Sequence, residues 1–111
     1  IFDKFGEVYP KDGMTWDEVY EISKNMTRIE DGIQYLGFNY YFLTGTFLTM
    51  NPYGQPWIES GTNRVIMSEG KWPEIFRNFQ RFYEIPGMED IRGTDAVNTF
   101  AAEERIAMQI T

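Results

Sequence analysis

The sequence predicts an α/β fold in which helices pack on a small mixed sheet. Three observations support this class: apolar residues recur at helical spacing in several segments, short apolar runs lie between these segments, and turns containing Gly and Pro separate them. Helices that alternate with strands along a chain are typical of an α/β layer. The length of 111 residues suits one unit, so we assign residues 1–111 to a single domain.

The composition excludes several classes of partner and site. The net charge of -7, from 10 basic and 17 acidic residues, disfavours nucleic acids and anionic membranes because both repel a negative protein. The chain has no Cys and no His, which excludes a thiol nucleophile and any metal site built on those side chains. Glu89, Asp90 and Asp95 could hold a hard cation, but their spacing fits no calcium loop and a plain acidic loop explains them, so we expect no metal and no cofactor. The chain begins at Ile1 without an initiator Met, and we expect it to be a piece of a longer protein.

The first predicted helix covers residues 15–26. Thr15 and Glu18 have the spacing of a capping box, in which each side chain bonds the backbone N–H of the other residue. Apolar and small side chains recur on one face of this helix. They are Trp16, Val19, Tyr20 and Ser23. The polar residues 27–32 that follow are predicted to form a connection ending in an Asp31-Gly32 turn.

A strand is predicted at 33–39 and a helix at 40–50, with aromatic and hydroxyl side chains crowded where one leads into the other. In α/β sheets, ligands bind just outside the carboxyl ends of the strands. Aromatic rings stack on the apolar face of a sugar, and hydroxyls bond its polar groups. We therefore expect a sugar-binding site, and the alternative is that these aromatic residues are core. The expected ligand-binding residues are Tyr40, Tyr41, Phe42, Thr44 and Trp57.

The second half of the chain is predicted to begin with a loop over residues 51–63, which ends in a hairpin-type connection at 59–63. The elements expected after it are a strand at 64–67, a helix starting at 68–71, a helix capped by Thr94 or Asp95, and a strand at 106–110. The first of these helices carries an aromatic stripe at spacings of three and four, which indicates a buried face. The stripe consists of Trp72, Ile75, Phe76, Phe79, Phe82 and Tyr83.

Neighbouring carboxylates provide the enzymatic alternative, because paired carboxylates can act as general acid and base. The pairs are Asp17/Glu18, Glu89/Asp90 and Glu103/Glu104. The first pair is explained by helix capping, and the others by solvated surface charge. We therefore expect no catalytic residues, and the enzyme retained as an alternative is a small glycan-processing module. A purely structural α/β fragment is the other alternative.

Four segments, in order along the chain, resemble the sugar-binding group of extracellular solute-binding proteins of bacterial ABC importers, the group that includes maltose-binding protein. Residues 10–18 (PKDGMTWDE) are similar to its entry segment, and residues 51–57 occupy the place of a small-residue turn. Residues 72–83 are similar to an aromatic helix of that family, and residues 100–108 to its ending, where a helix leads into a strand.

The resemblance implies that the chain is most of the C-terminal lobe of a two-lobed type II periplasmic-binding-protein-like fold. Such proteins close on a ligand by hinge motion and deliver it to a membrane permease. The resemblance further implies that the parent protein takes part in sugar transport, is extracellular or periplasmic, and is anchored to the membrane as a lipoprotein. Because a lobe without its partner exposes apolar surface, we also expect that the isolated piece can self-associate.

Overall fold

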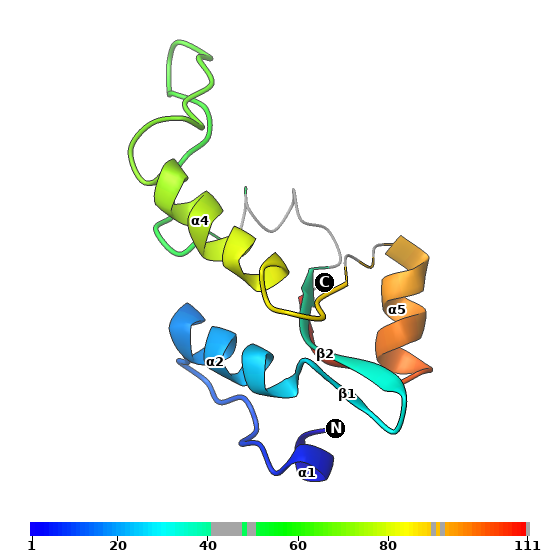
Figure 1. The fold of residues 1–111 in the computed structure, drawn as a ribbon. Coiled ribbons are helices and arrows are strands. Elements are labelled where there is room, and N and C mark those ends of the chain that lie inside the picture. The colour runs from blue at the N-terminus through cyan, green and yellow to red at the C-terminus, as the bar shows by residue number, and fades with distance from the viewer. Residues whose placement is uncertain (41–47, 49–50, 90, 92, 111) are drawn as a thin grey trace.

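The computed structural model describes residues 1–40, 48, 51–89, 91 and 93–110. Its helices and strands are, in chain order, α1 (Phe2–Phe5), α2 (Trp16–Met26), β1 (Arg28–Glu30), β2 (Ile33–Tyr40), α4 (Trp72–Tyr83), α5 (Gly93–Ala101) and β3 (Ile106–Ile110). The sheet lies in the middle, with α2 and α4 on one side and α5 on the other (Figure 1). The α/β class is therefore confirmed.

The sheet has the strand order β1-β2-β3 and is mixed, as expected. β1 runs antiparallel to β2, with Arg28 opposite Tyr35. β2 runs parallel to β3, with Leu36 opposite Ile106 and Tyr40 opposite Ile110. β2 and β3 consequently end at the same edge of the sheet.

β1 corrects the expectation that residues 27–32 form only a connection. The predicted turn is present, since Asp31 and Gly32 have φ values of 52° and 78°, but a strand precedes it. Only three residues pair with β2, and the central one, Ile29, is 69% exposed. Such a short edge strand has no buried face of its own, so no apolar alternation marks it in the sequence.

α2 begins with the predicted capping box. The Thr15 backbone N–H donates to Glu18 at 2.7 Å, and the Glu18 N–H donates to the Thr15 hydroxyl at 3.2 Å. The helix packs closely on β2 at Gly37, where a Cβ atom would lie within 2.6 Å of the Ser23 carbonyl carbon. The Gly37 N–H donates to the Thr27 hydroxyl at 2.9 Å. A glycine is therefore required at this crossing.

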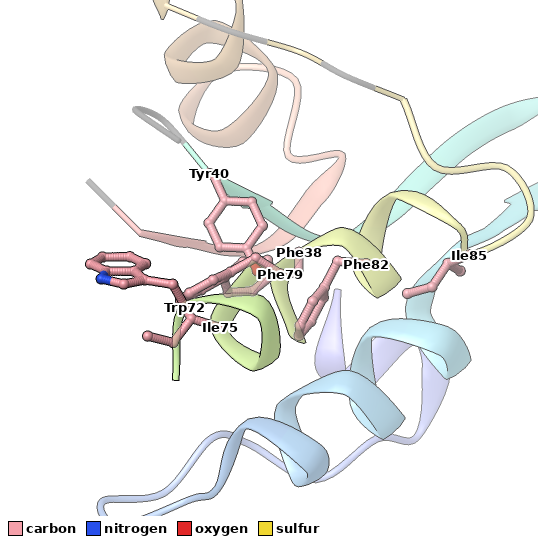
Figure 2. Packing of buried hydrophobic residues seen from close by; sticks show 7 residues of the cluster. All are labelled: Phe38, Tyr40, Trp72, Ile75, Phe79, Phe82 and Ile85. Carbon is pink, nitrogen blue, oxygen red and sulfur yellow. The ribbon is translucent and has the colours of Figure 1, made fainter. Parts of the chain in front are cut away.

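α4 supplies the main part of the core, which confirms the predicted aromatic stripe. Figure 2 shows its side chains packed with Phe38 and Tyr40 of β2. Four residues of the helix are fully buried, namely Trp72, Ile75, Phe79 and Phe82. Phe76 and Tyr83 are only partly buried at its margin. The helix begins later than expected, because residues 68–71 form turns, with Gly70 at φ 56°.

The segment before α4 extends beyond the N-terminal end of that helix, and the molecule measures 54 × 27 × 24 Å (Figure 1). The strand expected at 64–67 is wrong: a single antiparallel bridge joins Ile58 to Val65. The hairpin-type connection between them is present, with Gly61 and Asn63 at positive φ. Two backbone hydrogen bonds, Glu59 N–H to the Arg64 carbonyl and Ile66 N–H to the Trp57 carbonyl, flank this bridge, and the Arg64 side chain bonds both Glu59 and Glu69.

Three boundaries also differ from expectation. α1 was not predicted, and it is a single turn that ends at Gly6 with φ 69°. α5 begins at Gly93, before the expected caps Thr94 and Asp95. The helix expected at 40–50 cannot start at Tyr40, which is the last residue of β2, and nearly all of the rest lies outside the described residues.

Candidate functional site

The predicted site residues do not all lie in one described place. Tyr40 is 2% exposed and packs in the core, with its ring 5.3 Å from that of Phe79 and 4.7 Å from that of Phe38. Trp57 is 40% exposed and lines a cavity of about 390 Å³ on the segment before α4, together with Asn51 and Pro56. Tyr41, Phe42 and Thr44 lie outside the described residues.

Tyr40 nevertheless ends β2 at the position where α/β sheets bind ligands. β2 and β3 are parallel, so their carboxyl ends lie side by side. Tyr40 is opposite Ile110, and Asn39 is opposite Gln109. We call these four residues the carboxyl edge. Alternation along the strands places Asn39 and Gln109 on one face of the sheet and Tyr40 on the other.

Three polar atoms at the carboxyl edge are buried and have no hydrogen-bond partner among the described residues. They are the amide nitrogen Nδ2 of Asn39, the hydroxyl of Tyr40 and the amide oxygen Oε1 of Gln109. A buried polar group without a partner costs about 1–3 kcal/mol, and such groups are rare in folded proteins. Asn39 and Gln109 supply a donor and an acceptor on one face of the sheet, the pair that can bond a hydroxyl, while the Tyr40 hydroxyl lies on the other face.

The Tyr40 hydroxyl stays protonated. Burial raises its pKa above the ordinary value of 10.0, and the neighbouring Tyr83 raises it further. Because the neutral form is favoured, Tyr40 keeps its O–H as a donor over the whole physiological range.

Asn39 and Gln109 were not expected as site residues. Each is an amide at the penultimate position of a strand that is otherwise largely apolar. An amide at this position can be recognised in the sequence. Whether two such amides form one site depends on the pairing of β2 with β3, which brings Asn39 opposite Gln109. Only the register brings the two amides together.

A second concave region lies between the N-terminal end of α2 and the outer face of α4. This α2–α4 groove has a volume of about 420 Å³. Its lining residues are Thr15, Trp16, Asp17, Pro52, Tyr53, Glu74, Arg77, Asn78 and Arg81. Arg81 donates to Asp17 at 2.6 Å, which joins the two helices, and the Tyr53 hydroxyl donates to Glu74. Bonds from Tyr53 and Lys71 lower the pKa of Glu74 below its usual 4.5.

A third, more apolar groove of about 560 Å³ runs beside β3. Met14 and Val19 line it on one side, and Met108 and Ile110 on the other. Within the described part of the chain, β3 pairs only with β2, so its outer edge is open. This groove offers few polar groups to orient a small ligand.

Metal-binding clusters and membrane-spanning helices are both absent from the described residues. No group of three or more Asp or Glu side chains there is arranged to hold a metal ion. No described helix has the length and apolar character needed to cross a bilayer. Comparison with protein-family models, curated proteins and solved structures finds no match for the chain. The function therefore has to be argued from the geometry.

Proposed function

We propose that this chain is the ligand-binding lobe of an ABC-importer solute-binding protein and that it captures an oligosaccharide or related sugar for uptake. In this proposal the chain is one lobe of a type II periplasmic-binding-protein-like fold, and the whole protein is an extracellular or periplasmic lipoprotein that delivers its ligand to a membrane permease. One observation carries the proposal: buried polar groups without described partners lie at the shared carboxyl ends of two parallel strands.

A sugar fits this edge because each of its hydroxyls both donates and accepts a hydrogen bond. On one face of the sheet the Asn39 amide offers a donor and Gln109 an acceptor, and on the other face the Tyr40 hydroxyl offers either one. The expected aromatic residues Tyr41 and Phe42, with the Thr44 hydroxyl, directly follow Tyr40 in the sequence. Polar groups in an apolar, aromatic surrounding are typical of sites for neutral, hydroxylated ligands.

Two arguments favour binding over glycan hydrolysis. A glycosidase needs one carboxylic acid whose raised pKa keeps it protonated. Hydrogen bonds lower the pKa of Glu18 in the capping box and of Glu74 in the α2–α4 groove, which favours their ionised forms. The Glu103 carboxylate accepts a bond from Arg105 at 2.8 Å, as expected for solvated surface charge.

Asn39→Leu in the two-lobed protein tests the proposal. Leu keeps the branching of Asn at Cγ but is larger and cannot donate, so we expect sugar affinity to fall about tenfold or more. Because the donor has no described partner, the free energy of unfolding should stay the same or rise by about 1 kcal/mol. Binding of glucose, maltose and cellobiose would be followed by Trp fluorescence, and stability by urea unfolding.

Asn98→Leu is the matched control, because Asn98 is exposed on α5 and should affect neither property. If no sugar binds, or if Asn39→Leu lowers stability while affinity is unchanged, the amides of the carboxyl edge are structural and the proposal fails. Turnover of a sugar would instead support the enzymatic alternative.

A further inference from the structure

We propose that the α2–α4 groove is a second binding site and that it takes a carboxylate carried on a ring, such as an acidic sugar. The inference rests on which polar groups of the groove are already occupied and which are not. It is independent of the carboxyl edge, since none of the groove-lining residues belongs to that edge.

The Thr15, Asp17 and Glu74 side chains of the groove each already accept a hydrogen bond. The Thr15 hydroxyl accepts from the Glu18 N–H in the capping box. Asp17 accepts from Arg81 at 2.6 Å. Glu74 accepts from Tyr53 through one oxygen and from Lys71, at 3.0 Å, through the other. A ligand that mainly donates hydrogen bonds would therefore have to compete for these groups.

Several donors of the groove, in contrast, are unoccupied. Arg77 is exposed and makes no ion pair or hydrogen bond with the described residues, although its charge adds to the lowering of the Glu74 pKa. The Nδ2 atom of Asn78 and the Nη2 atom of Arg81, also without partners in the described part of the chain, are buried in the wall, so a ligand reaches them only after these side chains reorient. An excess of donors favours a ligand rich in acceptors, and a guanidinium is well suited to bind a carboxylate through two parallel bonds.

The groove is less negative than the chain as a whole, which carries -7. Its lining contains Arg77 and Arg81 against Asp17 and Glu74, so the lining charges cancel. Lys71, outside the lining, is paired with Glu74. The groove is therefore a neutral region on a negative molecule. Attraction of an anion should therefore act over a short range and weaken with salt.

The two aromatic residues of the groove are the proposed contacts for the ring of the ligand. Trp16 is partly buried, and its edge-on contact with Phe79, at 5.0 Å between ring centroids, holds the indole in place before any ligand arrives. Tyr53 is 47% exposed and is oriented by its bond to Glu74. Rings that are already ordered lose little freedom on binding.

Titration of the full chain with D-glucuronate, followed by NMR at the Trp16 indole and the Asn78 amide, tests this inference. Two control ligands separate the contributions: glucose has the ring but no carboxylate, and acetate has the carboxylate but no ring. We expect both to bind the groove at least about tenfold more weakly than glucuronate. We also expect Arg77→Gln to weaken glucuronate binding about tenfold.

Lys24→Gln is the matched control. It removes the same charge from α2, where Lys24 pairs with Glu21 outside the groove, and affinity should change less than about twofold. An equal loss in both variants would show that only net charge matters and would overturn the site. Acetate binding as tightly as glucuronate would overturn the role of the rings, and unchanged Trp16 and Asn78 signals would overturn the groove as the location.

Discussion

The carboxyl edge and the α2–α4 groove both contain polar groups without described partners, but they differ in burial. At the edge, Asn39 and Tyr40 are each 2% exposed, so their unpaired groups cannot be satisfied by bulk water. In the groove, Arg77 is exposed and water can solvate it. Unpaired groups at the edge therefore reduce stability in the absence of a ligand, whereas Arg77 does not. Binding and folding should be coupled at the edge and nearly independent in the groove.

Both regions depend on one core residue, Phe79, which is fully buried and contacts Tyr40 on one side and Trp16 on the other. Phe79→Ala should lower the free energy of unfolding by about 3–5 kcal/mol, because it removes a large side chain from a closed core. Sugar and glucuronate binding should both weaken. Urea unfolding measures the loss, and Phe100→Ala, at a residue 41% exposed, is the control. A change below about 1 kcal/mol would contradict the packing described here.

Gly37 distinguishes the two regions, because it determines how closely α2 approaches the sheet. Gly37→Ala would place a Cβ atom against the Ser23 backbone, so α2 has to shift. We expect a loss of about 1–3 kcal/mol in thermal or urea unfolding. Glucuronate binding should suffer more than sugar binding, because α2 forms a wall of the groove and no part of the carboxyl edge. Unchanged stability would show that α2 does not pack against Gly37.

Acid should affect the groove before the edge, and this is the smallest effect we expect. The pKa of Glu74 is lowered by its bonds from Tyr53 and Lys71. The stability from these bonds is therefore fully present above the unfolded value of 4.5 and is lost as the pH falls through the lower, folded pKa. Glu74→Gln should flatten this part of the pH–stability curve. Curves that stay parallel down to acid pH would show that these bonds do not form in solution.

The elements predicted correctly from the sequence are those whose determinants are local. The Thr15 and Glu18 capping box and the Asp31-Gly32 turn each depend on residues that are close along the chain. The stripe of α4 is periodic, so its buried face could be identified without knowing its partner. The strand at 64–67 was wrong because a short apolar run cannot by itself supply the partner that a ladder requires.

The candidate site was predictable only in its position along the chain. The aromatic residues after the first long strand predicted a site at the carboxyl end of β2, which stays a prediction, and they did not indicate that Tyr40 points into the core toward Phe79. Asn39 and Gln109 were missed because an amide near the end of a strand is common, and its surroundings depend on which strand lies beside it. The α2–α4 groove combines residues 15–17, 52–53 and 74–81, and no sequence pattern links these three segments.

The sequence by itself determined the α/β class, the ends of α2, the apolar face of α4 and the negative charge of the chain, because each follows from neighbouring residues or from composition. The tertiary structure alone decided that β1 exists, that Asn39 lies opposite Gln109 and that Arg77 faces a groove beside Trp16. The physical reason is that burial, pairing and unoccupied hydrogen-bonding groups depend on segments that are distant in the chain and adjacent only after folding.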